Sequence, residues 1–315
     1  MAKRWKKKKR VLTGFISLLL LTFTILTSVA ESGKLPFDFP SWSSLGQSVG
    51  IDNLELEKYP VQINTVDVGN ADFIYIRAND KNVVIDAGDI ATKDKVVAYL
   101  RRQGVQKIDY LIATHPHADH IGGMPEIIKN FDIGEIIAPK MNAKILPTTD
   151  IYKEFLTAVK DKNQTITAPV LGRAIEFGDC TLKILAPFGE DQSEINNTSI
   201  VTKFTYKDVS ALLMGDAEAD VERKIIKEYP AESLKADIFK VGHHGSSTSN
   251  TPELLEIVGA KYYIIPCGKG NKYNHPHADV LKRLKSFGGQ IYRSDYNKNV
   301  IFKTDGKEIK VDNEK

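Results

Sequence analysis

All seven histidines of this 315-residue chain lie in three short clusters. The clusters read THPHADH (residues 114–120), GHHGS (242–246) and NHPH (274–277). Imidazole nitrogens and carboxylate oxygens are the donor atoms that zinc takes at a hydrolytic centre. Because every histidine belongs to a motif instead of being scattered, the pattern predicts a metal site.

The first cluster has the spacing H-x-H-x-D-H. His115 and His117 are separated by one residue and can bind one ion, while Asp119 and His120 follow on the next turn and can bind a second. A buried strand predicted over residues 108–113 runs directly into the cluster, so these side chains should meet at the edge of a sheet. A polar loop with incidental histidines is disfavoured, because four ligand-type residues fall within six positions.

The first 30 residues have the pattern of a targeting segment. Seven basic residues lie within residues 3–10, and an uncharged, mostly apolar run follows over residues 11–30. Small residues at Ser28 and Ala30 fit a signal-peptidase site, yet a run of this length also suits an uncleaved anchor in a bilayer of ~30 Å. Either interpretation places the rest of the chain outside the cytoplasmic membrane, since the positive charges stay inside.

The charge balance argues against a globally basic nucleic-acid binder. The whole chain has 43 basic and 40 acidic residues, but removing the seven leader cations leaves 36 against 40, a net charge of −4. Two cysteines, Cys180 and Cys267, are expected to be free packing residues, with a disulfide as the alternative that an extracytoplasmic location permits.

We expect residues 31–58 to form a linker and residues 59–315 to form one domain of mixed α/β (α+β) class. Strands are predicted at 62–68, 73–77, 82–86, 108–113, 181–185, 200–206, 210–214, 236–241, 262–265 and 300–303. Helices are predicted at 92–103, shortly after Gly123, and at 151–160, 217–228, 252–258 and 278–287. Neither half looks purely parallel, which predicts two mixed sheets facing each other with helices outside.

Several motifs together resemble the metallo-β-lactamase superfamily. The residues that carry the resemblance, in order, are 66–72 (VDVGNAD), 86–88 (DAG), 114–120, 215–218 (GDAE), 241–246 (VGHHGS) and 271–276 (NKYNHP), spread over about residues 61–305. They are most similar to the branch that includes the extracytoplasmic hydrolase domain of the competence protein ComEC, with phosphorylcholine esterases as a neighbouring branch. The resemblance implies a four-layer αβ/βα sandwich.

The resemblance also implies roles for individual residues. His115 and His117 match ligands of a first metal ion, and Asp119 and His120 match ligands of a second. Asp216 matches the carboxylate that bridges the two ions. The last ligand matches either His244, which we favour, or His243. Asp86 matches an acid that orients ligand imidazoles, although it could simply cap a turn before Gly88.

One position departs from the general superfamily pattern. Many members have a further histidine between the first cluster and the bridging aspartate, but residues 121–242 contain none. The segment 195–199 occupies this region, where the amide oxygen of Asn196 could be a weak metal ligand or a substrate contact. Ser199 could support the ligands from behind or contact the substrate. The number of bound ions, one or two, therefore stays open.

The remaining candidates concern substrate contact. His275 could contact the substrate or protonate a leaving group, and Ser246 could contact the substrate, whereas His277 is expected to be exposed in the first turn of a helix. Zn²⁺ is the cofactor that the ligand types favour, with Mn²⁺ as the alternative.

Three functions follow in order of preference. The first is an exported metal-dependent phosphodiesterase or nuclease, with DNA as a candidate substrate, Asp119 accepting a proton from the attacking water, and membrane contact only through the N-terminal segment. The second is a hydrolase of another ester or amide, such as a lactone, a β-lactam or a phosphorylcholine ester. The third is a silent domain that binds metal or a wall component.

Overall fold

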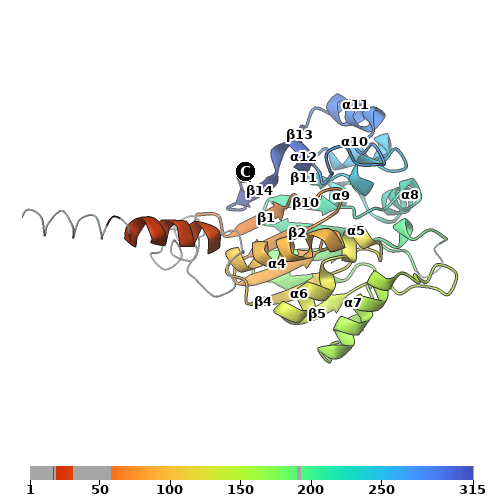
Figure 1. Ribbon diagram of the computed structural model, residues 1–315. Helices are drawn as coiled ribbons and strands as arrows, with labels where there is room; N and C mark the ends of the chain where they lie inside the picture. The colour runs from red at the N-terminus through yellow and green to blue at the C-terminus, as the bar shows by residue number, and fades with distance from the viewer. Residues whose placement is uncertain (1–16, 18, 31–57, 190–192, 315) are drawn as a thin grey trace, which may run out of the picture. The chain divides into compact units, whose positions relative to one another are not determined.

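The computed structural model describes residues 17, 19–30, 58–189 and 193–314 (Figure 1). Contacts divide the chain into two compact units, residues 1–55 with 98–104 and residues 56–97 with 105–315. In the first unit, residues 19–30 are helical. None of the described helices combines the length and the apolar character needed to cross a membrane. The predicted basic segment and all but the last residue of the predicted linker lie outside the described residues.

The second unit contains two mixed sheets. The first has eight strands among the described residues, in the order β15-β14-β1-β2-β3-β4-β5-β6, and the second has seven, in the order β13-β12-β11-β10-β9-β8-β7. The strands of the first sheet are β1 (Val61–Thr65), β2 (Ile74–Ala78), β3 (Lys81–Ile85), β4 (Lys107–Ile112), β5 (Asp132–Ile137), β6 (Ile166–Thr167), β14 (Asn299–Thr304) and β15 (Ile309–Glu314). Those of the second are β7 (Ala174–Phe177), β8 (Cys180–Ile184), β9 (Thr202–Tyr206), β10 (Val209–Leu213), β11 (Ile238–Lys240), β12 (Tyr262–Ile265) and β13 (Gln290–Arg293).

Each sheet is parallel at one end and antiparallel at the other. In the first sheet the β3–β4, β4–β5 and β5–β6 pairs are parallel, and in the second the β10–β11, β11–β12 and β12–β13 pairs are parallel. The remaining pairs are antiparallel. This arrangement confirms the prediction of two mixed sheets.

The two sheets face each other across one apolar core. Ile63 and Ile76 of the first sheet pack in the same buried cluster as Phe204 and Leu213 of the second. Strand β10 is buried at all five positions. Such near-continuous apolar runs are expected of strands that are covered on both faces.

Helices flank the sheets. They are α4 (Lys93–Arg102), α5 (Ala118–Ile121), α6 (Met124–Asn130), α7 (Asp150–Asp161), α8 (Ala219–Glu228), α9 (Ala231–Leu234), α10 (Pro252–Val258), α11 (Ala278–Ser286) and α12 (Ser294–Asn297), with short 3₁₀ turns η1 (Ile90–Thr92), η2 (Asn196–Thr198) and η3 (Gly242–Gly245). Helices α8, α10 and α11 bury Val221, Leu254 and Leu284 against Phe239 and Tyr263 of the second sheet. Helices α5 and α6 both contact α7.

The predicted elements are present with small shifts in their ends, and five strands were not predicted: β5, β6, β7, β13 and β15. Cys180 and Cys267 are both buried and free, as predicted.

Candidate metal centre

The carboxyl ends of strands from both sheets supply the predicted ligand residues. Asp86 follows β3, and the first histidine cluster follows β4, its parallel neighbour. In the second sheet Asp216 follows β10, and His243 and His244 follow the parallel β11. Because parallel strands end at the same sheet edge, side chains far apart in the sequence are brought together there.

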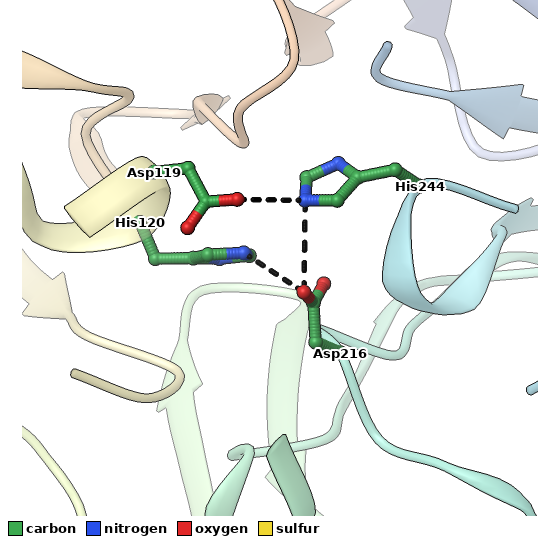
Figure 2. A group of neighbouring side chains, drawn as sticks. All are labelled: Asp119, His120, Asp216 and His244. Carbon is green, nitrogen blue, oxygen red and sulfur yellow. Dashed lines mark ion pairs between the residues drawn. The ribbon is translucent and has the colours of Figure 1, made fainter. Parts of the chain in front are cut away.

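Four of the predicted ligands form one group around Asp216 (Figure 2). Asp119, His120, Asp216 and His244 each offer one ligand atom, and these atoms all lie within 4.8 Å of one another. Asp216 Oδ2 lies 3.2 Å from His120 Nε2 and 3.6 Å from His244 Nε2, and His244 Nε2 lies 3.3 Å from Asp119 Oδ2.

Two of these imidazoles are oriented from behind through their other ring nitrogen. His120 Nδ1 lies 2.7 Å from Asp86 Oδ2, and His244 Nδ1 lies 3.0 Å from the carbonyl oxygen of Pro266. Asp86 also accepts hydrogen bonds from the backbone N–H and the hydroxyl of Thr114, at 2.8 and 2.7 Å. Partners of this kind fix the ring tautomer and leave Nε2 with a free lone pair, as a metal ligand requires.

The donor set fits a bound cation. Among the buried side-chain atoms of the described residues that lack a hydrogen-bond partner are His120 Nε2, His244 Nε2 and Asp216 Oδ1. An unsatisfied buried polar atom costs about 1–3 kcal/mol. Three such atoms in one group, two of them on oriented imidazoles that can lose a proton, are explained by a cation to which all three bind.

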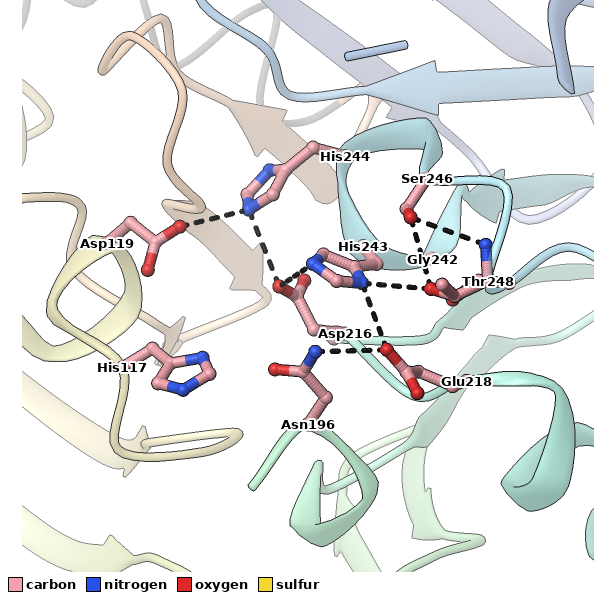
Figure 3. Close-up of polar contacts among 12 residues, drawn as sticks. His117, Asp119, Asn196, Asp216, Glu218, Gly242, His243, His244, Ser246 and Thr248 are labelled. Carbon is pink, nitrogen blue, oxygen red and sulfur yellow. Dashed lines mark hydrogen bonds and ion pairs between the residues drawn. The ribbon is translucent and has the colours of Figure 1, made fainter. Parts of the chain in front are cut away.

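Further histidine nitrogens lie near the same carboxylate oxygen of Asp216, among them that of His243 (Figure 3). His115 Nε2 lies 3.0 Å from His117 Nδ1 and 3.9 Å from Asp216 Oδ2, and His243 Nε2 lies 3.7 Å from the same oxygen. Asn196 reaches this region as well, donating from Nδ2 to Glu218 Oε1 at 3.1 Å while its buried Oδ1 has no hydrogen-bond partner.

Both histidines of the second cluster face Asp216 because of an uncommon backbone. His243 and His244 have φ angles of 51° and 52°, in the left-handed region that residues with a β-carbon rarely adopt. Strain of this type persists where the surrounding structure enforces it, and it is concentrated at functional sites. Here Asn250 accepts a 2.7 Å hydrogen bond from the N–H of Gly242, and the N–H of His243 donates to the Gly215 carbonyl at 3.1 Å.

The other predicted residues take different positions. Ser199 accepts a 3.0 Å hydrogen bond from the N–H of Asp216 and lies 3.4 Å from His115 Nδ1, behind the ligands. Ser246 instead pairs with Thr248 at 3.1 Å within its own loop. The His275 ring lies beside the rings of His243 and His244, with its centroid 5.4 Å from that of His243.

A buried ion pair lies under the site, and the sequence analysis did not predict it. Lys240 and Asp72 are fully buried, and Lys240 Nζ lies 2.5 Å from Asp72 Oδ2 and 3.6 Å from Asp216 Oδ1. Lys240 also donates to the Gly215 carbonyl at 2.7 Å. Asp72 Oδ1 in turn lies 3.3 Å from His244 Nδ1. The available signal was a lysine inside an apolar run that leads into the second cluster.

The direction of the pKa shift differs among the histidines of the site. Burial opposes charge on His120, but Asp216 and Asp86 raise its pKa well above the ordinary 6.5. Burial favours protonation of Asp216, but His120 and His244 hold its pKa well below 3.8. In contrast, burial and the neighbouring His120 lower the pKa of His115 well below 6.5. At neutral pH a metal-free His120 is therefore protonated, whereas His115 is neutral.

Comparison with known proteins agrees with this geometry. Residues 66–269, more than half of the chain, match the metallo-beta-lactamase superfamily. The chain is 28% identical over 260 residues to ComE operon protein 3 of Bacillus subtilis (strain 168), covering 77% of this chain and 33% of that protein. It is 30% identical over 242 residues to Recombination protein 2 of Haemophilus influenzae, covering 75% and 28%.

This chain thus spans about a third or less of the length of these two relatives. Among solved structures, the metallo-beta-lactamase fold protein YhfI from Bacillus subtilis superposes with a TM-score of 0.52 at 12% identity, covering 78% of this chain and all of that chain. The two mixed sheets flanked by helices, the ligand group at their strand ends and the family match agree, and the chain belongs to the metallo-beta-lactamase superfamily.

Proposed function

We propose that this protein is a metal-dependent phosphodiesterase whose centre holds two divalent cations. The group of Asp119, His120, Asp216 and His244, with its three unsatisfied buried atoms, carries this proposal. A second ion would be held by His115 and His117, whose rings lie next to this group. The fourth ligand of this second ion would be His243, whose Nε2 faces the shared carboxylate. The amide oxygen of Asn196 is the alternative. Nitrogen and carboxylate ligands favour Zn²⁺, and Mn²⁺ is the alternative.

The chemistry of such a centre suits phosphodiesters. Divalent cations held by these residues would supply Lewis acidity and would lower the pKa of water at the site toward ~7. A phosphodiester develops negative charge on the oxygens that face such a centre. Its transition state is therefore stabilised more than that of a neutral ester. The relative named for recombination supports nucleic acid as a substrate class to test.

Two residues of the chain are placed to assist. The side chain of Asp119 is 27% exposed, more than its buried neighbours, so it is open to solvent and can accept a hydrogen bond from the attacking water. Burial opposes its charge, but His244 and His120 keep the pKa of Asp119 below the ordinary value, so the carboxylate is ionised at neutral pH. Burial lowers the pKa of His275 to about 4, so this imidazole is neutral and can contact a leaving group through either ring nitrogen.

The test is a metal-resolved assay on the purified protein. Bound metal would be quantified, and turnover of bis(p-nitrophenyl) phosphate and single-stranded DNA measured with and without added Zn²⁺ or Mn²⁺. Metal-dependent cleavage of the diester supports the proposal. Bound metal with no diester cleavage refutes it, and parallel assays of a lactone, a β-lactam and p-nitrophenylphosphorylcholine would then show whether another hydrolysis or a silent domain replaces it.

Metal binding should release protons at neutral pH. The raised pKa values of His120 and His244 mean that protons occupy these rings in the metal-free protein, and ligand nitrogens must lose their protons to bind. Apparent affinity for Zn²⁺ should therefore rise with pH and keep rising above pH 6.5, because both pKa values are raised above that ordinary value. Calorimetric titration in two buffers of different ionisation enthalpy counts the protons released. A count of zero at pH 7 would contradict the assigned ligands.

We also propose that the protein acts outside the cytoplasmic membrane and that its N-terminal segment directs it there. Support comes from the basic cluster at residues 3–10 followed by the apolar run to Ala30. Fusion of alkaline phosphatase to the C-terminus should give phosphatase activity in cells, since that enzyme folds only after export. Mass spectrometry of the recovered protein would show whether residues 1–30 are removed, and an inactive, intact fusion would overturn the assignment.

A further inference from the structure

A file of aromatic rings leads from the surface to the candidate metal centre. The ring of Tyr273 is stacked on that of His275, with centroids 5.6 Å apart and planes at 24°. His275 is in turn stacked on His244, at 6.3 Å and 23°. Exposure falls along the file, from 51% at Tyr273 to 9% at His275 and 1% at His244. An exposed ring is thus stacked in line with a proposed metal ligand.

The loop that carries Tyr273 is fixed before any substrate binds. The side chain of Asn271 accepts hydrogen bonds from the N–H groups of Tyr273 and His275, at 3.2 and 3.0 Å, and donates to the His275 carbonyl at 2.6 Å. The N–H of His277 donates to the Gly245 carbonyl at 2.9 Å, which ties this loop to the second histidine cluster. A ring held in advance loses little conformational freedom when a ligand stacks on it.

The charge beside this ring distinguishes between ring-binding ligands. Lys272 Nζ lies 4.8 Å from the centre of the Tyr273 ring, and both side chains are exposed. A quaternary ammonium such as choline would have to compete with this cation for the ring face. A nucleotide also needs the ring face, but its base is uncharged and the displaced, flexible lysine can pair with its phosphate, so no like charges meet.

An unsatisfied atom in the same file points to a ligand as well. His275 Nδ1 is buried and has no hydrogen-bond partner. Buried polar atoms of this kind are rare in native structures and call for a partner that the protein alone does not supply. A polar group of a substrate bound beside His275 would provide one.

We propose that Tyr273, with Lys272 beside it, is a subsite for the nucleoside next to the scissile phosphate, so that the substrate is a nucleotide diester such as single-stranded nucleic acid. This inference rests on the proposed phosphodiesterase function and specifies its substrate class. Tyr273 is a binding residue on which the base stacks, while the reaction at phosphorus takes place at the ligand group.

The test compares two esters with one leaving group. Thymidine 5′-(p-nitrophenyl phosphate) and methyl p-nitrophenyl phosphate differ only in the nucleoside, so the ratio of their kcat/KM values measures nucleoside selectivity. We expect the metal-loaded protein to prefer the thymidine ester and Tyr273→Ala to lower the ratio about 5- to 100-fold, the range found for loss of one base stack. Tyr273→Phe should keep the ratio. Tyr296→Ala is the matched control, because Tyr296 is 71% exposed with Arg293 over its ring at 4.6 Å.

A binding measurement separates this inference from the proposed function. Fluorescence anisotropy of labelled (dT)₈ in EDTA detects the subsite without turnover, and Tyr273→Ala should weaken binding by about 5-fold or more. Equal selectivity and equal (dT)₈ binding in Tyr273→Ala and the unmodified protein overturn the subsite. If Tyr273 raises kcat/KM for p-nitrophenylphosphorylcholine and not for the thymidine ester, the nucleoside subsite is also overturned, in favour of a choline subsite. Tyr273-dependent (dT)₈ binding without turnover of either ester would refute the phosphodiesterase and support the subsite.

Discussion

Replacing Asp216 with asparagine should lower kcat/KM for bis(p-nitrophenyl) phosphate at least about 100-fold and should reduce the bound metal. Asp216 Oδ2 faces the Nε2 atoms of four imidazoles at 3.2–3.9 Å, those of His115, His120, His243 and His244. Removal of residues that merely orient ligands already costs 10–100-fold in metal affinity or activity. Loss of the one carboxylate that both ligand sets share should therefore cost more.

The Asp216→Asn result depends on a control that separates the site from the fold. Asp220 lies four residues further on, is exposed, and pairs with Arg223 at the start of α8. Asp220→Asn should leave turnover and metal content within about 2-fold of the unmodified protein. Elemental analysis, circular dichroism and the diester assay would be run on both variants. Unchanged metal content with turnover within 10-fold in Asp216→Asn would contradict the central role of this carboxylate.

Local sequence signals predicted the parts of the site that lie next to one another in the chain. An apolar strand that ends in ligand-type residues places them at a sheet edge, and the first cluster and Asp216 do follow strands β4 and β10. The choice between His243 and His244 stayed open because it depends on backbone geometry. Both adopt a left-handed conformation and both face Asp216, but only His244 belongs to the four-residue group.

Features that depend on distant partners were not predictable. Strand β5 contains Gly134, which looks like a breaker in the sequence. In the structure a β-carbon at this position would lie 2.5 Å from the Asp109 carbonyl, so the glycine permits close approach of the neighbouring strand β4. Lys240 escaped notice for a related reason. Lysine is seldom buried, but β11 lies between β10 and β12, and the distant Asp72 supplies the compensating charge.

That buried pair leads to the largest expected change in stability. Lys240→Met keeps a long unbranched side chain but leaves Asp72 and the Gly215 carbonyl without their ammonium partner. Removing one member of a buried ion pair costs about 3–5 kcal/mol, and we expect this loss in the free energy of unfolding, measured by urea denaturation in EDTA. Lys261→Met is the control: Lys261 pairs with Asp237 at 2.9 Å, but its side chain is 71% exposed, so the expected loss is below about 1 kcal/mol.

The pH dependence of stability provides a second readout for Lys240. Burial opposes its charge, but Asp72 and Asp216 raise its pKa above the ordinary 10.5. A raised pKa in the folded state means that the stabilisation is fully present below pH 10.5 and is lost as the pH rises through the folded value. The difference in unfolding free energy between the unmodified protein and Lys240→Met should therefore be constant from pH 7 to 9 and shrink only in strongly alkaline solution. A difference that already disappears between pH 7 and 9 would mean that the buried lysine is neutral, and the ion pair beneath Asp216 would have to be replaced by a hydrogen bond between uncharged partners.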